Sequence, residues 1–337
     1  MIKRHRRRLA VVGAVLFWAA LGCGTSERDP VEVAIRKGSN FPEAAESMYV
    51  HGLVRTPRLF GQYASVFKRD RTIRYGRYII PRGASWNQIL TALEKGEGIV
   101  RRVVVPEGWA EWDIVPALAD SLGVPRDSVE AAVRDTVLLR RVSVPRGTRT
   151  LEGYLFPDTY EFPDGTTALQ AVEIMVQRLE RVWTPEWSAR ALELKMTRHQ
   201  VLTLASIVEK EVRRGAERPT VAAVYHNRLR IGQMLQADPT VQFALGRRRP
   251  GRVLYRDLLV DSPYNTYRRT GLPPGPIASP GAASIAASLY PADVPYRYFV
   301  AHPDGHHEFR NTYAEHLKAI EFVRSVARRD SLARLPE

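Results

Sequence analysis

Residue types that build disulfides and metal sites are scarce in this protein. Cys23 is its only cysteine, so no disulfide can form within the chain. Histidine occurs eight times, but neither His307 nor His316 has a second histidine or a carboxylate at a spacing that predicts a metal site. We therefore expect no metal ion, and no motif in the chain predicts any other cofactor.

Acidic residues are few relative to basic ones. The 36 Asp and Glu residues stand against 50 Lys and Arg, which gives a formal net charge of +14. Such a charge favours anionic surroundings: nucleic acid, acidic lipid or an anionic wall polymer. The basic residues are mostly scattered arginines, so the charge alone does not choose among these. The apolar fraction of 45% is ordinary for a globular protein, and 337 residues suit two domains or one large one.

The N-terminus has a basic head followed by an apolar run that is short for a membrane span. Basic residues crowd positions 3–8, and Leu9–Cys23 carries no charge, whereas a comfortable span needs about 20 residues. This pattern is typical of an export signal, and it predicts that the rest of the chain lies outside the cytoplasm, which disfavours nucleic acid as a partner. Residues 20–22 resemble a bacterial lipobox, with Ala20 in place of the usual leucine. A lipid on Cys23 and an uncleaved membrane span both remain open.

The first half repeats a strand–turn–helix pattern three times. Each copy has a short apolar strand, a glycine, and apolar residues six, seven and ten positions later. Each implied helix stops at a second glycine, as a left-handed helix end requires. The unequal spacing of the copies excludes a solenoid. The apolar helix positions are Ala44, Ala45, Met48, Ile89, Leu90, Leu93, Ile114, Val115 and Leu118.

These small units loosely resemble LysM-like glycan-binding modules. Trp86, Trp109 and Trp112 are candidates for stacking on sugar rings. Trp86 and Trp112 lie beside the apolar helix positions, and for all three tryptophans we favour packing in or beside the core.

The stretch Leu204–Val212 predicts a helix with two carboxylates beside its apolar stripe. Apolar residues recur at three-and-four spacing, and Glu209 and Glu211 fall on the two flanks of the stripe. A carboxyl group held against apolar neighbours loses solvation, so its pKa rises and it can donate a proton near neutral pH. The helical spacing does not decide which of the two glutamates has this role.

Other elements of the second half are typical of a binding cleft or of ordinary packing. Residues 151–160 are rich in aromatics and carboxylates, and a long proline-rich loop covers residues 264–277. Amphipathic helices are predicted over residues 167–183 and 219–229. Asp238 precedes Pro239 in the manner of a helix N-cap, so capping is its alternative role.

Several separated blocks carry a specific family resemblance. They are LEGYLFPDTY from Leu151, ASIVEKE from Ala205, NRL from Asn227, LQADPTVQFALG from Leu235, YNTY from Tyr264, GLPPGPIASPG from Gly271 and YFVAHPDGHHEF from Tyr298. In order and spacing the sequence resembles the YceG-like family of endolytic murein transglycosylases. His306 departs from the pattern, since the family tends to a glycine there.

The resemblance implies a membrane-anchored lyase that cuts the MurNAc–GlcNAc β-1,4 bond of nascent peptidoglycan strands and leaves 1,6-anhydro ends. It implies peptidoglycan and the membrane as partners, with peptidoglycan synthases (penicillin-binding proteins) as further ones. It assigns the catalytic proton to Glu211, the last glutamate of its block. Candidate substrate-binding residues by resemblance are Glu152, Tyr154, Asp158, Asn227, Gln236, Asp238 and Asn265.

The predicted fold class is α+β, in two domains on the outer face of the inner or cytoplasmic membrane. Two other functions stay open: a non-catalytic wall-binding or division scaffold, and a water-using muramidase with Asp158 or Asp238 as second carboxylate. The predicted segments are an anchor over 1–23, a linker over 24–30, a LysM-like region over 31–125, a connecting helix and loop over 126–150, a catalytic domain over 151–325 and a tail over 326–337.

Overall fold

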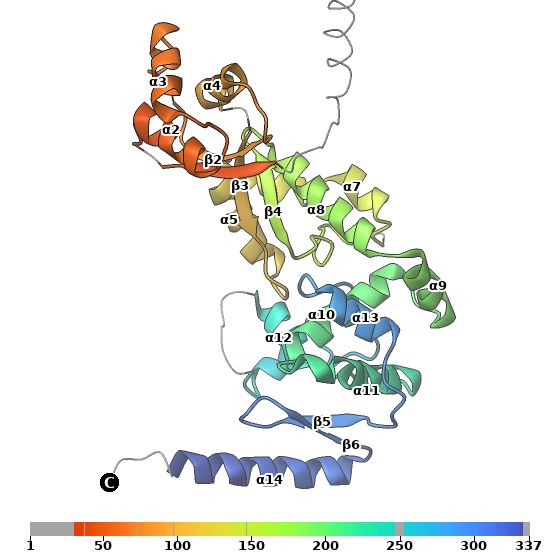
Figure 1. The fold of residues 1–337 in the computed structure, drawn as a ribbon. Coiled ribbons are helices and arrows are strands. Elements are labelled where there is room, and N and C mark those ends of the chain that lie inside the picture. Colours follow the sequence, from red (N-terminus) through yellow and green to blue (C-terminus); the bar gives the residue numbers. More distant parts are fainter. Residues whose placement is uncertain are drawn as a thin grey trace, which may run out of the picture. The chain divides into compact units, whose positions relative to one another are not determined.

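The computed structural model describes residues 30–332, except for residues 37, 72, 97, 146 and 247–252 (Figure 1). The predicted anchor over 1–23 and nearly all of the linker lie outside the described residues. None of the described helices combines the length and apolar character that a membrane crossing needs. The chain divides into two compact units at Val100 and Arg101, within strand β3 (Ile99–Val104).

The first unit folds around two antiparallel strands and three helices. Strand β1 (Val31–Ile35) pairs with β2 (Gly76–Ile80), and Val33 lies opposite Tyr78. Helices α2 (Phe41–Val50), α3 (Pro57–Val66) and α4 (Trp86–Lys95) pack beside them. The Asn40 and Ser85 side chains cap α2 and α4, and the left-handed Gly96 follows α4. All the apolar positions predicted for the first two helices are buried, which confirms that part of the pattern.

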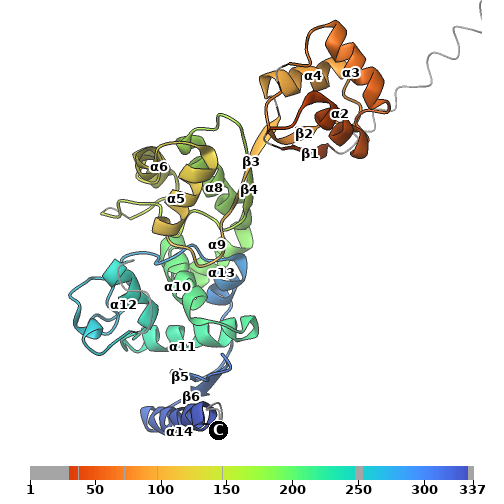
Figure 2. The same cartoon turned by 90° about the vertical axis from the view of Figure 1, so that its left-hand side faces the viewer.

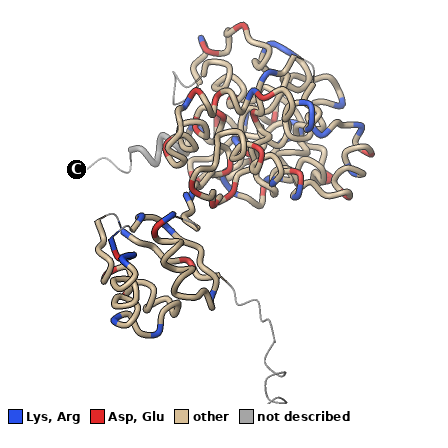
Figure 3. The backbone as a smooth tube through the Cα atoms, turned by 90° about the horizontal axis from the view of Figure 1, so that it is seen from above, with Lys and Arg blue, Asp and Glu red and all other residues tan. Residues whose placement is uncertain are grey.

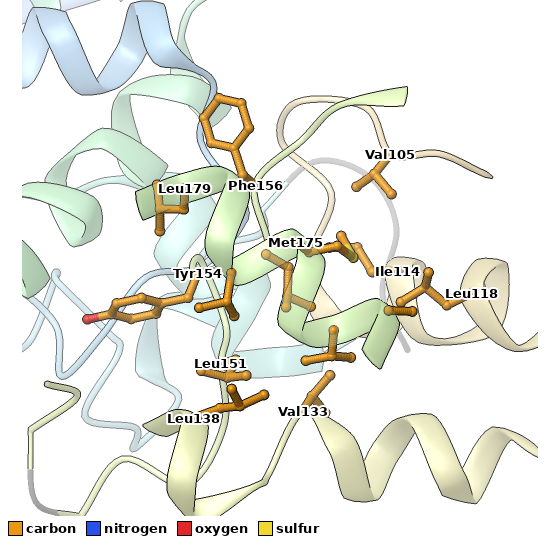
Figure 4. Packing of buried hydrophobic residues seen from close by; sticks show 14 of the residues in the cluster. Val105, Ile114, Leu118, Val133, Leu138, Leu151, Tyr154, Phe156, Met175 and Leu179 are labelled. Carbon is orange, nitrogen blue, oxygen red and sulfur yellow. The ribbon is translucent and has the colours of Figure 1, made fainter. Parts of the chain in front are cut away.

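The third strand–turn–helix copy belongs to the second unit. Ile114, Val115 and Leu118 of α5 (Glu111–Leu122) share a core with Leu151 and with α8 (Ala168–Val182), as Figure 4 shows for part of this cluster. The unit boundary at residue 100 therefore differs from the predicted range of 125–150. The third copy buries its apolar face against later helices rather than against the first two copies. Three more elements lie around this core: α6 (Arg126–Ala132), α7 (Thr136–Arg141) and β4 (Thr159–Pro163).

A second group of helices surrounds α10 (Arg198–Glu211) (Figure 2). Thr197 and Gln200 form a capping box at its start. Every residue from Val201 to Val208 is buried, whereas the sequence pattern predicted a buried stripe along one side of the helix only. The reason is that α10 contacts helices on several sides: α9 (Pro185–Glu193), α11 (Arg218–Arg230), α12 (Asp238–Leu245) and α13 (Ala282–Leu289). Also present are the 3-10 turns η1 (Gly215–Glu217) and η3 (Asp257–Leu259).

The chain ends in a hairpin covered by a long helix. Strand β5 (Tyr298–Ala301) pairs antiparallel with β6 (His307–Arg310), and α14 (Tyr313–Leu332) packs against both. Helices and short strands thus occur together in both units, in agreement with the mixed composition of the predicted α+β class. Figure 3 shows the basic residues scattered along the backbone of each unit, as the sequence indicated.

Candidate active site

Glu211 lies in the wall of a cavity of about 500 Å³. Glu211 is the last residue of α10. The middle of this helix is buried, and its C-terminal end places the Glu211 side chain at the edge of the buried core. Asp238 and Gln242 of α12, the β5–β6 hairpin, and Val323 and Arg324 of α14 form other parts of the wall. The residue keeps some solvent exposure, so a substrate in the cavity can reach its carboxyl group.

The surroundings of Glu211 raise the pKa of its carboxyl group to about 7. Burial is the main cause, because a charged carboxylate loses solvation among its neighbours, and the negative charge of Asp238 adds to the effect. The Tyr225 hydroxyl opposes it by donating a hydrogen bond to Glu211 Oε1 over 3.1 Å, and Arg228 opposes it by its positive charge. Near neutral pH, Glu211 can therefore exist in both the protonated and the ionised form.

Asp238 shares the cavity with Glu211 and is held by Tyr267. The Tyr267 hydroxyl donates to Asp238 Oδ1 over 2.6 Å. Asp238 is the first residue of α12; Ala237 occupies the N-cap, and no side chain caps this helix. The alternative role of Asp238 as a capping residue is therefore wrong. Instead, its carboxylate accepts a hydrogen bond from the phenol of Tyr267, 29 residues later in the chain. This bond fixes the Asp238 side chain beside the cavity.

Tyr225 and Arg228 of α11, which both interact with Glu211, are buried. Arg228 donates its Nε–H to the Arg297 carbonyl over 2.6 Å and a second N–H to the Leu235 carbonyl. Burial lowers the pKa of its guanidinium and raises that of the Tyr225 phenol. These contacts hold a positive charge and a hydroxyl donor near Glu211. The site predictions did not include Tyr225, Arg228 or Tyr267; the only signal in the sequence was their place in or beside the NRL and YNTY blocks.

Glu209 has a different environment, although it is only two residues from Glu211. Its side chain is 7% exposed and forms an ion pair with Arg218 over 3.3 Å. Its second oxygen accepts the N–H of Gly281, the N-cap of α13, over 3.0 Å. Glu107 also approaches Arg218, within 3.7 Å. Glu209 thus ties three parts of the fold together, and it is not among the residues that line the cavity.

The Glu107 carboxyl group lies directly against the backbone of Gly281. A Cβ there would lie 1.8 Å from Glu107 Oε1. The two carboxylates of Glu107 and Glu209 therefore meet the positive N-terminal end of α13 at close range, an arrangement that stabilises a helix start. Burial and the neighbouring Glu209 raise the pKa of Glu107.

Of the predicted substrate-binding residues, Asp238 lines this cavity and the others do not. Glu152 is 8% exposed, and its Oε2 accepts the backbone N–H of Glu111 at the start of α5 over 2.9 Å. Burial raises the pKa of Glu152 to about 8. Among the described atoms, its Oε1 has no hydrogen-bond partner. Tyr154 is buried, and its hydroxyl lies 2.7 Å from His199 Nδ1.

The remaining candidates mostly organise loops. Asp158 forms an ion pair with Arg178 over 2.7 Å. Asn227 donates to two carbonyls of the segment before β5, and Asn265 donates to the Leu258 and Val260 carbonyls. Gln236 is exposed and adopts a left-handed backbone with φ of 50°. The contacts of Asn227 and Asn265 thus give the NRL and YNTY blocks a structural role, because they fix the loops that follow these residues or pack beside them.

The tryptophans make aromatic contacts typical of packing. Trp86 lies edge-on to Phe60, with 5.6 Å between ring centroids, and Trp112 contacts Phe243 at 5.0 Å. Trp109 packs against the α5–α8 core. These contacts agree with the packing interpretation that the sequence favoured.

Over the described ranges, no three His, Cys, Asp or Glu side chains gather as a metal site would require. His307 instead contacts Glu217, with 2.7 Å between its Nδ1 and Oε2, and it stays buried in the cavity wall. The absence of a cofactor stays a prediction.

Comparison with known proteins identifies the family to which the chain belongs. Residues 33–322 match the sequence model of the YceG-like family. The chain is 32% identical over 328 residues to an endolytic murein transglycosylase of Bacillus subtilis, covering 93% of this chain and 91% of that one. A relative of the same name from Streptococcus pneumoniae is 30% identical over 299 residues, which cover 80% of this chain and 54% of the longer relative. A crystal structure of a yceG-like protein from Listeria monocytogenes superposes with a TM-score of 0.63 at 30% identity, over 86% of this chain and 98% of that chain. The chain belongs to the YceG-like family.

Proposed function

We propose that this protein is an endolytic murein transglycosylase, a lyase that cuts peptidoglycan glycan strands without consuming water. The observation that carries the proposal is the Glu211 carboxyl group, which lies in a cavity wall with a pKa of about 7. Membership of the YceG-like family and two relatives with this name support it. A scaffold without activity would have no need of a titrating carboxyl group in an accessible cavity.

In the proposed reaction, a single carboxyl group serves both proton transfers. Protonated Glu211 donates its proton to the glycosidic oxygen between MurNAc and GlcNAc, and the bond to C1 of MurNAc breaks. The Glu211 carboxylate then accepts the proton of the muramic C6 hydroxyl as that oxygen bonds to C1. The products are a free GlcNAc hydroxyl and a 1,6-anhydro-MurNAc end, so all atoms of the substrate are retained. Tyr225 stabilises the carboxylate between the two steps through its 3.1 Å hydrogen bond.

Asp238 is the second carboxyl group in the cavity wall, so it can stabilise the positive charge that develops at C1 in the transition state. Its place in the same cavity also supports a second candidate function, a muramidase in which Asp238 activates water. The burial of Glu211 and its pKa fit both reactions, whereas the name of the relatives, murein transglycosylase, supports the reaction without water.

The membrane anchor, the LysM-like region and the synthase partners belong to the same proposal. The basic head and apolar run of residues 3–23 support an anchor, with a lipid on Cys23 or a membrane span as its two forms. The small helix-and-strand first unit supports glycan binding outside the catalytic cavity. A tether of this kind would bring the enzyme to nascent strands and to the synthases that make them.

Mass spectrometry of the products tests the proposal. Purified sacculi are incubated with the full chain, and the released ends are identified. A transglycosylase leaves anhydro ends, which are lighter by one water than the reducing ends left by a muramidase. A scaffold releases no fragments, and either of these two results would reject the proposed reaction.

A further inference from the structure

Positive charge borders the cavity that contains Glu211. Lys210 and Arg213 lie on either side of Glu211 in the chain, and Arg324 reaches the same cavity from α14. These three cations stand against two carboxyl groups in the wall, Glu211 and Asp238. At a pH near 7 the Glu211 carboxyl group is partly neutral, so the cavity attracts anions.

The neighbouring cations and histidines are already paired. Arg214 contacts Asp304 over 2.8 Å, and Arg310 forms an ion pair with Glu308. The two histidines of the cavity wall lie against carboxylates, His302 at 2.9 Å from Glu308 and His307 at 2.7 Å from Glu217. By contrast, Arg213 and Arg324 form no ion pair within the described part of the chain. Their guanidinium groups are available to a ligand.

The stem of Arg213 is held in place although its head is unpaired. Gly305, in the turn between β5 and β6, has a left-handed backbone with φ of 88°. A Cβ on Gly305 would lie 3.3 Å from Cδ and 3.5 Å from Cβ of Arg213, so the turn lies directly against the arginine stem. A positioned stem reduces the conformational entropy that the side chain loses when its head binds a ligand.

We propose that Arg213 and Arg324 form a subsite for a carboxylate carried by the lactyl side chain of the muramic residue at the scissile bond. This inference rests on the proposed function, because it takes Glu211 as the group that protonates the glycosidic oxygen at C1. The lactyl group is attached to C3 of the same sugar ring, so a substrate on Glu211 brings this group to the cavity border. Guanidinium groups bind carboxylates through paired, charge-assisted hydrogen bonds.

Two sources can supply this carboxylate. On a stripped strand it is the free lactyl carboxylate itself, and on an intact strand it belongs to the peptide stem attached to the lactyl group. Three strand preparations separate them: strands with stems, strands stripped of stems by an amidase, and stripped strands whose lactyl carboxylates are converted to neutral methylamides.

The test measures binding and turnover of these strands. The dissociation constant is measured on the full chain carrying Glu211→Gln, which leaves the strand intact, with and without Arg213→Gln and Arg324→Gln. Glutamine keeps the part of the Arg213 stem that contacts Gly305. Arg181→Gln, at an exposed position of α8 that does not line the cavity, is the control for the loss of one positive charge.

We expect the paired arginine substitutions to weaken binding of a carboxylated strand about tenfold or more, as the loss of charge-assisted hydrogen bonds predicts. Binding of the methylamide strand and binding by the Arg181→Gln control should not change. In the otherwise wild-type chain, KM should rise while kcat stays near its wild-type value. A larger effect with stems identifies the stem as the source, and a larger effect on stripped strands identifies the lactyl carboxylate.

The subsite would be overturned if the Glu211→Gln chain bound charged and neutral strands equally well, both with and without the two arginine substitutions. It would also be overturned if these substitutions weakened the binding of charged and neutral strands by the same factor. The proposed function fails in a different way, since the wild-type chain would then release no anhydro ends from any preparation while the binding comparison could still be read.

Discussion

Glu209 and Glu211 occupy the same helix end, yet their surroundings differ in kind. Glu209 has an arginine and a backbone N–H as partners, which compensate its charge. Glu211 has a phenol on one side and a second carboxylate nearby, which leave its charge poorly compensated. Glu209 is therefore part of the architecture, whereas Glu211 is a group whose proton can move. The neighbours, and not the position on the helix, thus separate a structural glutamate from the glutamate that we propose as catalytic.

The largest expected difference between the two is in activity. Glu211→Gln keeps the size of the side chain but removes the proton donor, and general acid–base catalysis contributes about 10²–10⁴-fold. We expect strand cleavage to fall by at least that factor, with binding retained. Glu209→Gln should keep most of the activity of its folded fraction. The rate at which anhydro ends are released measures the activity of both variants. An inactive Glu209→Gln enzyme with wild-type stability would contradict the purely structural role of Glu209.

The reverse order is expected for folding. Glu209→Gln removes one partner of an ion pair whose arginine is 20% exposed, and it places an amide at the start of α13. We expect a loss of about 1–3 kcal/mol in the free energy of unfolding at pH 7. Urea unfolding of the second unit measures it. An unchanged midpoint would show that the Glu209–Arg218 pair contributes nothing to stability.

The neighbours of Glu211 should move the pH profile in opposite directions. Glu211 must be protonated to begin the reaction, so kcat/KM should fall as pH rises through about 7. Asp238→Asn removes a negative charge that raises the pKa of Glu211, so this decline should move to lower pH. Tyr225→Phe removes a donor that lowers that pKa, so the decline should move to higher pH. We expect shifts of roughly half to one pH unit; shifts of the same sign would contradict the assigned causes.

The stability of Glu211→Gln should depend on pH differently from that of the wild type. The folded protein holds this proton up to a pH of about 7, well above the ordinary value near 4.3 for an unfolded chain. Burying the ionised carboxylate therefore lowers stability as pH rises between these values, and the full cost is present above 7. The glutamine variant should exceed the wild type by up to about 3–4 kcal/mol at pH 8 and by nothing at pH 4. Thermal unfolding at the two pH values measures this difference.

Local sequence patterns predicted the helices better than the site. The apolar positions after Gly38 and Gly83 are all buried, because each of these helices packs against neighbours close in the chain. The unit boundary differed because α5 packs against α8, more than 50 residues later. No periodicity within α5 shows which partner covers its apolar face.

The site depends on contacts that no single block contains. Tyr225 reaches Glu211 from 14 positions away, and Tyr267 reaches Asp238 from 29 positions away. Helical spacing left Glu209 and Glu211 equivalent, because it ignores which side chains of other helices face each flank. Most of the polar residues in the blocks proved to bind backbone carbonyls or other internal partners, which the sequence cannot distinguish from substrate contacts.

Titration of the Glu211 carboxyl group shows directly whether this group carries a proton near neutral pH. Carbon-13 labelling of the glutamate carboxyl groups allows each to be followed with pH by nuclear magnetic resonance, and the signal missing from Glu211→Gln identifies this residue. Glu152, whose pKa is also raised, is identified in the same way from Glu152→Gln. We predict a titration midpoint near pH 7 for the Glu211 carboxyl group. A midpoint near the ordinary value of about 4.3 would contradict this prediction, because Glu211 would then be ionised throughout the neutral range and would have no proton to donate.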